Sequence, residues 1–527
     1  MTSCGAAIPG LLEAYGITHV FGIPGTHSIE MYRGLEASGL RHVLPRHEQG
    51  GAFMAQGFAD VAGRPAACFF ITGPGLTNAA TGIAQAYQAS VPMLVLTPVN
   101  PRNTLGKGLG HLHELTDQSA VAKPFTAFSE TAMSAAEVPP LIARAFDVFE
   151  SQRPRPVHIE VPIDVFIEAA NGDWSKTAPP ARPVADENDI DKAAELLKGA
   201  KAPLFLIGGG ARAAAPAVDY LARRLGAAVV SSNAAKEIIP HSSPWYLGAT
   251  RDRPGTVDML RAADVVVGIG TELSPTDSYG SELIINGAFI RIDLDPHELT
   301  SDYAADVALL GDAKETLDAI GRLLGHGDAP DGRQEAIAAA REKNLGEPDE
   351  TTWLHMSLLD TLRNTLPADT IWSGDMTQVV YTADWYLKVA EPGRYLQDAG
   401  FGSLGCALPV ALGAKLARPD QPVVAIAGDS GVLYSMQEMA TAREEGIDIL
   451  LYVWNNQALG QIRDDMIGAQ IAPTQVEPIP PDFSKMAEMF DWSYAQADGG
   501  DALADATVAG LDRSGPTLIE IRDPRAF

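Results

Sequence analysis

The chain has 527 residues, too many for a single hydrophobic core, so roughly two to four domains are expected. Its 39 Lys and Arg residues against 67 Asp and Glu residues give a formal net charge of −28. That charge argues against nucleic acid or an anionic membrane as a partner, because both are bound by basic protein faces. The beginning of the chain lacks the pattern of a signal peptide, and no uncharged apolar run reaches about 18 residues, so no membrane span is expected.

The three cysteines are also informative about the protein's surroundings. Cys4, Cys68 and Cys406 are far apart in the chain and show neither CxxC spacing nor the density of a disulfide framework. We therefore expect neither a zinc site nor disulfides, and a reducing, cytoplasmic compartment.

Short β-branched runs alternate with helical patterns along the whole chain. Such runs, continuous in apolar residues, are typical of strands in parallel sheets that are buried on both faces. Residues 171–189 and 323–350 interrupt the alternation with proline, glycine and charge, and are expected to be linkers. The sequence thus predicts an α/β protein with three doubly wound parallel-sheet domains, at residues 1–168, 190–322 and 351–527.

The last block contains one clear strand–helix–strand unit. The buried strand PVVAIAGDS (422–430) is followed by a helical pattern (435–442) and a second buried strand, IDILLYVWNN (447–456). Such crossovers are right-handed, and their parallel strands share a carboxyl-end edge. Asp429 and Asn456 are therefore expected at the same edge, where open α/β sheets bind their ligands.

These residue types suit a divalent cation and a phosphate. A carboxylate, an amide oxygen and a loop carbonyl are ligands that Mg²⁺ accepts, and Mg²⁺ completes its shell with water and substrate phosphates. The backbone N–H groups of Ser430 and Gly431, at a helix start, can hold the same phosphates. The alternative is two ordinary strand ends that carry turn-forming Asp and Asn.

The pattern resembles thiamine-diphosphate-dependent enzymes of the pyruvate decarboxylase and acetolactate synthase superfamily, whose signature is Gly-Asp-Gly and, about 25 residues later, Asn-Asn. This chain reads Gly428-Asp429-Ser430 and Asn455-Asn456, with serine replacing the third glycine. The resemblance implies that Asp429, Asn456 and the carbonyl of Ala458 hold Mg²⁺. It extends to SGDMTQ (373–378) and GFGSLGCALPVALGAK (400–415). The other cofactor-binding residues that it implies here are Thr377, Gly402, Leu404, Gly428, Ser430 and Gly431.

The first block contains LPRHEQGGAFMAQGFA (44–59), in which Glu48 precedes a run of small residues. By itself this pattern is also typical of an exposed acid at a helix N-terminus. The resemblance implies that Glu48 is the catalytic glutamate, which hydrogen-bonds N1′ of the aminopyrimidine and promotes loss of the C2 proton. The resulting ylid attacks a 2-oxo acid, and loss of CO₂ leaves an enamine. The small residues would let the helix and a partner subunit close over the site. The pyrimidine pocket would be lined by Pro24, Thr72 and Asn78.

The same resemblance has implications for partners. In this superfamily the two halves of one cofactor are bound by different subunits, which implies a homodimer or homotetramer with its active site at the interface. The middle block would be the central domain, which binds FAD in acetohydroxyacid synthases. LFLIGGGARAA (204–214) only partly follows a dinucleotide-binding loop, and no acid ends the next strand, AAVVSSN (227–233), so FAD is unlikely to bind here.

The substrate residues are predicted from two further stretches. His113, in GHLHELTDQ (110–118), and His27, in the loop after the first strand, are candidate proton-transfer groups or else structural histidines. After Asn456 comes the segment that faces substrate in the superfamily. A carboxylate there would pair with a guanidinium, and the alternative is a solvated helix turn with internal Arg–Asp pairing. The candidates in that segment are Ile462, Arg463 and Asp465.

Three functional hypotheses follow. In texture the chain is nearest to the acetolactate-synthase-like branch that includes 5-guanidino-2-oxopentanoate (2-ketoarginine) decarboxylases, so the leading one is decarboxylation of a 2-oxo acid, a lyase reaction. The second is an acetolactate-synthase-type carboligase, a transferase that joins the enamine to a second carbonyl compound. The third is a non-catalytic cofactor-binding homologue, against which the retained Glu48, Asp429 and Asn456 argue.

Overall fold

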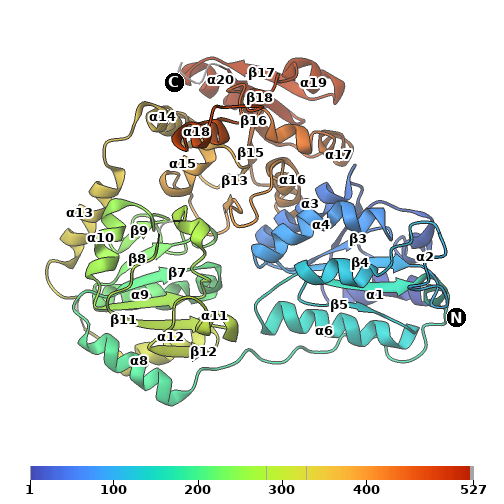
Figure 1. Ribbon diagram of the computed structural model, residues 1–527, viewed down its shortest axis with the longest axis horizontal. Helices are drawn as coiled ribbons and strands as arrows, with labels where there is room; N and C mark the ends of the chain where they lie inside the picture. Colours follow the sequence, from blue (N-terminus) through green and yellow to red (C-terminus); the bar gives the residue numbers. More distant parts are fainter. Residues whose placement is uncertain (1, 281, 328, 523–527) are drawn as a thin grey trace. The chain divides into compact units, whose positions relative to one another are not determined.

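The computed structural model describes residues 2–280, 282–327 and 329–522. The chain folds into two compact units, each drawn in Figure 1 as sheets flanked by helices. The first unit comprises residues 1–180, 370–378 and 401–527, and the second comprises residues 181–369 and 379–400. The N-terminal and C-terminal blocks of the sequence therefore share one unit, and the middle block forms most of the other.

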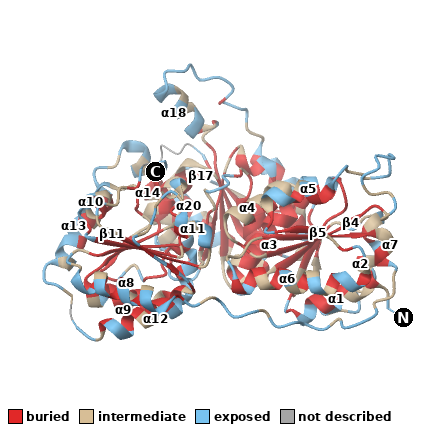
Figure 2. Ribbon diagram, turned by 60° about the horizontal axis from the view of Figure 1, so that its bottom comes forward, coloured by how far each residue is buried: buried red, intermediate tan, exposed pale blue. Residues whose placement is uncertain are grey.

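The first sheet lies in the N-terminal block of the first unit, with strand order β2-β1-β3-β4-β6-β5 and parallel pairing throughout. Every residue of the central strands β3, β4 and β6 is buried, as Figure 2 shows for β4, which explains their continuous apolar sequences. Its strands are β1 (His19–Gly22), β2 (Arg41–Val43), β3 (Ala66–Phe69), β4 (Met93–Val99), β5 (Ser129–Thr131) and β6 (Val157–Pro162). Its helices are α1 (Cys4–Ala14), α2 (Ile29–Arg33), α3 (Glu48–Ala62), α4 (Pro74–Gln88), α5 (Gln118–Ala122), α6 (Val138–Ser151) and α7 (Ile163–Phe166).

The second unit contains a parallel sheet of order β12-β11-β10-β7-β8-β9. The expected linker 323–350 holds a helix, α13, that packs on α10: Asn344 Oδ1 accepts a hydrogen bond from Thr256 N (3.0 Å). The strands are β7 (Leu204–Ile207), β8 (Ala228–Ser231), β9 (Tyr246–Gly248), β10 (Val265–Ile269), β11 (Ala288–Asp293) and β12 (Val307–Leu310). The helices are α8 (Glu187–Gly199), α9 (Ala215–Leu225), α10 (Pro254–Ala262), α11 (Pro296–Thr300), α12 (Ala313–Leu324), α13 (Arg333–Leu345) and α14 (Glu350–Thr365).

A third sheet, built on the C-terminal block, has the order β14-β13-β15-β16-β18-β17. The helix expected over 435–442 begins later, at Glu438, because a single 3₁₀ turn (Gly431–Tyr434) comes first. The strands are β13 (Ile371–Gly374), β14 (Tyr395–Leu396), β15 (Val423–Gly428), β16 (Leu450–Trp454), β17 (Ser493–Ala497) and β18 (Thr517–Ile521). The helices are α15 (Gln378–Tyr386), α16 (Ala407–Ala417), α17 (Glu438–Glu445), α18 (Gly460–Gly468), α19 (Phe483–Met489) and α20 (Gly500–Leu511).

Three six-stranded parallel sheets with flanking helices confirm the predicted α/β fold class. The sheets fall inside the three predicted blocks, while the block boundaries themselves stay predictions. In the part of the chain that the structure describes, no helix is long and apolar enough to cross a membrane. Cys4, Cys68 and Cys406 are all buried, and none of the three is in a disulfide bond.

The small residues of α3 permit an unusually close helix crossing inside the first unit. Nearly the whole circumference of α3 is buried, and α16 of the same chain packs against it. A Cβ added at Gly57 would lie 2.8 Å from the carbonyl carbon of Val410, and one at Gly413 would lie 2.7 Å from that of Met54. The small residues, expected to accommodate a partner subunit, thus accommodate a helix of their own chain.

Candidate active site

The carboxyl edge of the first sheet gathers the residues predicted for the pyrimidine pocket. Glu48 begins α3, directly after the loop that leaves β2, and its side chain is only 7% exposed. Asn78 Nδ2, on α4, donates a hydrogen bond to Glu48 Oε2 (3.0 Å). The N-cap of α3 is His47, whose Nδ1 accepts from Gln49 N (3.2 Å). The structure therefore brings Glu48 and Asn78 together, whereas Pro24, in the loop after β1, is exposed.

Thr72 belongs to a buried hydrogen-bond network that the sequence did not reveal. The centre of the network is Gln118, 2% exposed, whose Oε1 accepts from Thr72 Oγ1 and from Gly73 N, both at 2.8 Å. Its Nε2 donates to Thr97 Oγ1 and to Glu160 Oε2, both at 3.0 Å. Gln118 thereby fixes the turn from β3 into α4, the helix that carries Asn78. The only sequence signal for it was its place after Asp117, which caps α5.

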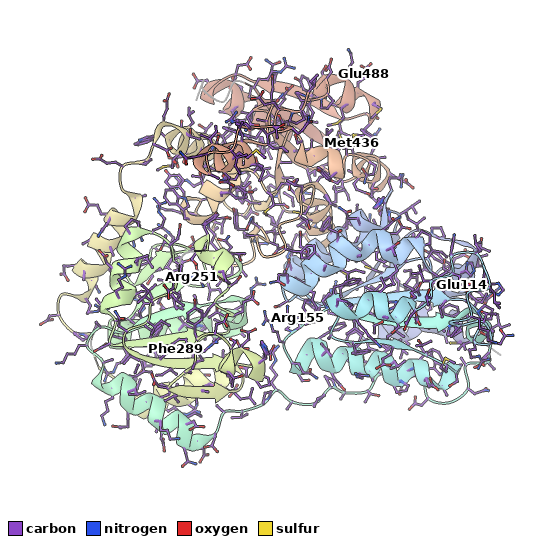
Figure 3. All side chains as sticks on the ribbon, in the orientation of Figure 1. Glu114, Arg155, Arg251, Phe289, Met436 and Glu488 are labelled. Atoms are coloured by element: carbon purple, nitrogen blue, oxygen red, sulfur yellow. The ribbon has the colours of Figure 1, made fainter. Side chains whose placement is uncertain are left out.

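The two predicted histidines come together at the same sheet edge. The ring centroids of His27 and His113 lie 5.4 Å apart, and the Nδ1 atom of each is buried without a hydrogen-bond partner. His113 has a positive φ of 61°, in the loop where Glu114, labelled in Figure 3, accepts from the backbone N–H of His111 (2.9 Å). Burial, and secondarily His113, lower the pKa of His27.

Asp429 and the segment after Asn456 meet at the carboxyl edge of the third sheet, as the strand–helix–strand argument predicted. Gly428 and Trp454 are paired in the ladder of β15 and β16. Asp429 is 2% exposed, and its Oδ1 and Oδ2 accept from Ser430 N (2.6 Å) and Gln457 N (2.7 Å). Burial raises the pKa of Asp429, and these amide bonds oppose that rise. A cation bound next to this buried carboxylate would stabilise its charged form.

The structure separates the two asparagines of the Asn-Asn pair. Asn455 Nδ2 donates to Glu520 Oε1 (2.6 Å) of β18, which ties this residue to the sheet. Asn456 is less buried, and its Oδ1 accepts from Ala458 N (3.2 Å), in the loop that also contacts Asp429. Asn456 and Ala458 are thus placed with Asp429.

Two neighbouring loops complete this second cluster. Asp375, 1% exposed, accepts from Gly405 N through both carboxylate oxygens (2.9 Å each), and burial raises its pKa to about 7. It therefore anchors the 402–405 loop, in which Gly402 and Gly405 have positive φ values of 67° and 82°, which glycine adopts readily. A Cβ added at Gly428 would lie 3.4 Å from Thr377 Oγ1, so Thr377 faces the same loop.

The residues of the second cluster fit a metal-bound diphosphate. The oxygen donors of Asp429, Asn456 and the backbone are those that Mg²⁺ prefers. A Cβ at Gly431 would lie 3.0 Å from Asp375 Oδ2, so the packing of Asp375 against this loop accounts for a glycine there. Within the residues described, no hydrogen bond joins the predicted residues of this cluster to those around Glu48.

The predicted substrate segment is a solvent-exposed helix turn. Ile462 is 49% exposed on α18, which stands out in Figure 2 as a largely exposed element. Arg463 Nε donates to Asp464 Oδ1 (3.2 Å), and Gln461 Nε2 donates to Asp465 Oδ1 (2.9 Å). The internal Arg–Asp pairing considered as the alternative is therefore present, with Asp464 rather than Asp465 as the acid.

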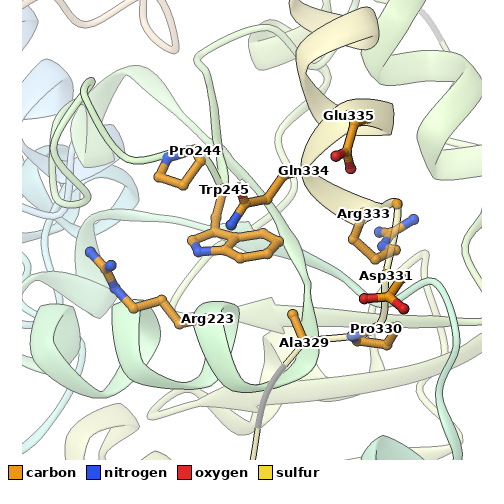
Figure 4. Close-up of a pocket in the computed structure, with 10 residues that line it drawn as sticks. Arg223, Pro244, Trp245, Ala329, Pro330, Asp331, Arg333, Gln334 and Glu335 are labelled. Carbon is orange, nitrogen blue, oxygen red and sulfur yellow. The ribbon is translucent and has the colours of Figure 1, made fainter.

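The second unit contains a cavity of about 420 Å³, and its glycine-rich loop is explained by packing. The cavity is lined by Arg223, Trp245 and Arg333 among others (Figure 4), near the amino ends of β8 and β9. Ligands of α/β sheets bind at the opposite, carboxyl edge. At that edge, a Cβ at Gly210 would lie 2.9 Å from Gly270 Cα, so close loop packing accounts for a glycine there.

Three parallel sheets with flanking helices, with a buried glutamate at the carboxyl edge of one and a buried aspartate at the carboxyl edge of another, are the arrangement expected of a cofactor-dependent enzyme. Comparison with known proteins agrees. Residues 2–121 match the N-terminal TPP binding domain of thiamine pyrophosphate enzymes, residues 190–320 their central domain, and residues 375–521 their C-terminal TPP binding domain. The chain belongs to the thiamine pyrophosphate enzyme family.

Individual relatives are similar over nearly their whole length. The probable 2-ketoarginine decarboxylase AruI of Pseudomonas aeruginosa is 44% identical over 528 residues, which cover 99% of this chain and 94% of that protein. The acetolactate synthase isozyme 1 large subunit of Escherichia coli is 30% identical, with 97% and 92% covered. An acetolactate synthase of Arthrospira platensis is 28% identical, with 98% and 93% covered. The expected family, its thiamine diphosphate cofactor and an enzyme of the decarboxylase or acetolactate synthase type are confirmed.

Proposed function

We propose that the protein decarboxylates a 2-oxo acid with thiamine diphosphate and Mg²⁺, and that its substrate is 5-guanidino-2-oxopentanoate. The observation that carries the proposal is the 44% identity, over 99% of this chain, to a probable 2-ketoarginine decarboxylase. When bound, thiamine diphosphate supplies an acidic carbon that adds to the 2-oxo group and accepts the electrons released with CO₂. The chain's own residues bind and orient the cofactor and move protons.

Glu48 is the proposed proton-transfer residue for the pyrimidine. Its carboxylate would exchange a proton with N1′, and the 3.0 Å bond from Asn78 Nδ2 holds Oε2 in place for that task. The burial of Glu48 keeps water from competing for the same hydrogen bond. Thr72 and Pro24 are the proposed lining residues of this half of the site.

The second cluster would hold the diphosphate end. Asp429, Asn456 and the Ala458 carbonyl are the proposed Mg²⁺ ligands, and their proximity at one sheet edge supports the assignment. The backbone of Gly428, Ser430 and Gly431, with Thr377, would contact the phosphate oxygens. Gly402 and Leu404 would support the ring system, on a loop that Asp375 anchors.

The proposed roles nearest the substrate belong to two histidines and α18. The unpartnered Nδ1 atoms of His27 and His113 are available to protonate the reacting carbon after CO₂ leaves or to bind the carboxylate. Among Ile462, Arg463 and Asp465, the acid is the group whose charge matches a guanidinium. The formal net charge of −28 favours a cationic substrate side chain in the same sense.

The second candidate function is a carboligase of the acetolactate synthase type. It is favoured by the 30% identity to an acetolactate synthase large subunit over 97% of this chain. Both reactions release CO₂, so only the product separates them: an aldehyde for the decarboxylase and a 2-hydroxyketone for the carboligase.

The assembly and the location belong to the same proposal. Within one chain, no hydrogen bond among the described residues joins Glu48 to Asp429, and a complete site would combine the two clusters from different subunits, in a homodimer or homotetramer. A cytoplasmic location agrees with three free, buried thiols.

A substrate comparison tests the proposal. Protein given thiamine diphosphate and Mg²⁺ is assayed for CO₂ release from 5-guanidino-2-oxopentanoate, an uncharged 2-oxo acid of the same length, an aromatic 2-oxo acid and pyruvate. We expect the guanidino acid to have the highest kcat/KM. A higher kcat/KM for pyruvate would overturn the proposed substrate, and CO₂ release that does not require thiamine diphosphate would overturn the proposed chemistry.

A further inference from the structure

One buried acid in the first unit has no part in the proposed chemistry. Glu438, the first residue of α17, is 0% exposed. Its carboxylate accepts hydrogen bonds from Arg46 N (3.0 Å to Oε2), His47 N (3.0 Å to Oε1) and Thr441 Oγ1 (2.8 Å to Oε2). An acid is rarely buried completely unless its charge is compensated. The hydrogen-bond donors to this carboxylate therefore indicate what Glu438 does.

Two of those partners are the peptide groups that immediately precede Glu48. Arg46 and His47 end the loop between β2 and α3, and their N–H groups point at Glu438 rather than into the helix. His47 also caps α3 with its side chain. The backbone just before Glu48 is thus fixed from both sides, by Glu438 on the loop and by the cap on the helix.

The space around the carboxylate is fitted to it. A Cβ added at Gly50, in the first turn of α3, would lie 2.6 Å from Glu438 Cδ, so any larger residue there would displace the acid. Thr441 Oγ1, one turn along α17, also reaches Leu44 O (3.4 Å). Burial raises the pKa of Glu438, and the amides of Arg46 and His47 together with Thr441 oppose the rise, as they would for a charge-assisted cluster.

Other contacts between the same two segments are ion pairs at the surface. The guanidinium of Arg46 pairs with Glu444, and that of Arg41 pairs with Glu445 at 2.7 Å. The side chains of Arg41 and Glu444 are about half exposed, at 49% and 52%. Such exposed pairs contribute little to stability, so they hold the loop less firmly than a buried acceptor does. They provide matched controls on the same helix.

α17 also follows the loop proposed to hold the diphosphate. Only the segment 430–437, which contains one 3₁₀ turn and Met436 (labelled in Figure 3), separates Asp429 from Glu438. Glu438 therefore connects the element after the proposed metal site to the loop that presents Glu48 in the same chain.

We propose that Glu438 is a positioning residue for the proposed catalytic Glu48: its buried carboxylate holds the N–H groups of Arg46 and His47 and thereby sets the direction of the Glu48 side chain. The inference rests on the proposed function for the role of Glu48. Removing the acceptor leaves the N–H groups of Arg46 and His47 without their partner on α17, and the loop will rearrange to satisfy them. A displacement of about 1 Å at a reacting group lowers a rate by about 100-fold.

The test compares Glu438→Ala, Glu438→Gln and Gly50→Ala with wild type, all as full-length protein with thiamine diphosphate and Mg²⁺. Glu438→Ala should lower kcat by about 100-fold. Glu438→Gln retains one acceptor oxygen for both amides and should restore roughly a tenth of wild-type kcat. Gly50→Ala displaces Glu438 without removing it and should resemble Glu438→Ala. In all three, KM for the 2-oxo acid and the Kd of thiamine diphosphate should change little, because Glu438 is not among the residues proposed to bind either ligand.

Two controls and a second readout separate positioning from general destabilisation. Glu444→Gln changes the same charge on the same helix, and Gly10→Ala adds a Cβ to a helix where it meets nothing within 4 Å. Both should retain wild-type kcat. In protein without cofactor, hydrogen–deuterium exchange of the peptide spanning residues 41–52 should accelerate in the Glu438 variants and not in Glu444→Gln.

The outcomes distinguish this inference from the proposed function. Wild-type kcat in both Glu438→Gln and Gly50→Ala would overturn the positioning role, as would unchanged exchange over residues 41–52 in Glu438→Gln. A loss of kcat in Glu444→Gln as large as in Glu438→Gln would overturn it as well. If wild type shows no turnover that depends on thiamine diphosphate, the proposed function fails, and exchange over residues 41–52 still decides whether Glu438 holds the loop.

Discussion

The crossing of α3 and α16 gives the most quantitative prediction, because a glycine of each helix lies directly against the backbone of the other helix. A Cβ at Gly57 would lie 2.8 Å from the Val410 carbonyl carbon, and a Cβ at Gly413 would lie 2.7 Å from that of Met54. Carbon atoms in contact are normally about 3.5–4.0 Å apart, so Gly57→Ala or Gly413→Ala must push the helices apart by roughly 1 Å. Overpacking of this kind costs about 1–3 kcal/mol, offset by up to about 1 kcal/mol from the better helix propensity of alanine.

The two substitutions should not be additive. The separation that accommodates the first Cβ also relieves the second, so the double variant should lose less than the sum of the two single losses, by about 0.5 kcal/mol or more. Thermal unfolding measures this: Tm of each single variant should lie roughly 2–6 °C below that of Gly10→Ala, which has the same gain in helix propensity without the overpacking, taking about 2 °C per kcal/mol for a unit of this size. Gly10→Ala, in an open position of α1, should not lower Tm. Single variants as stable as Gly10→Ala, or strictly additive losses, would refute the shared contact.

Three further predictions concern chemistry and pH. Glu48→Gln should keep the Kd of thiamine diphosphate within about tenfold of the wild-type value and lower kcat by about 10²–10⁴-fold, because a proton-transfer group is lost. Isothermal titration measures the Kd and a turnover assay measures kcat. An undiminished kcat would contradict the role of Glu48. Asp429→Ala should weaken binding of thiamine diphosphate by more than about 100-fold and remove the dependence of that binding on Mg²⁺. Asp505→Ala, which changes an exposed acid of α20, should have neither effect. Mg²⁺-dependent binding retained in Asp429→Ala would contradict the metal assignment. Burial lowers the pKa of His158 to about 3, so below about pH 6.5 only the unfolded chain takes up this proton and the contribution to stability is lost as pH falls. His158→Gln should therefore reduce the difference in unfolding free energy between pH 7 and pH 5 by roughly 2 kcal/mol; an unchanged difference in denaturation profiles would show that His158 is not held neutral.

The elements and the sheet edges could be predicted because their signals are local. Continuous apolar runs fixed the parallel sheets, and the shared direction of parallel strands placed Asp429 beside the segment after Asn456. The hydrogen bond from Gln457 N to Asp429 Oδ2 shows that the two strand ends lie next to each other. The small residues after Glu48 were predicted to let their helix and a partner subunit close over the site, and the structure shows that they pack against α16 of the same chain.

The remaining parts depend on contacts between distant segments, which no local pattern encodes. In MQEMATAREEG, Glu438 looks like one more acid on a solvated helix face, and only tertiary packing shows that, of the three acids, it is the one that is fully buried. Gln118 gave only the signal of its place after the capping Asp117, because its partners lie in three distant segments of the chain. The sequence suggested no role for Arg46. In the structure its backbone N–H donates to Glu438 and its guanidinium pairs with Glu444.

The central claim is that this chain uses thiamine diphosphate, with Glu48 as its acid–base group, to release CO₂ from a 2-oxo acid and form an aldehyde. The most direct measurement is the ratio of aldehyde to CO₂ formed from 5-guanidino-2-oxopentanoate by wild type and by Glu48→Gln, with and without thiamine diphosphate and Mg²⁺. The account predicts one aldehyde for each CO₂ in the loaded wild-type protein, and almost none of either product in Glu48→Gln or without cofactor. A 2-hydroxyketone in place of the aldehyde, or equal CO₂ release from Glu48→Gln, would contradict it.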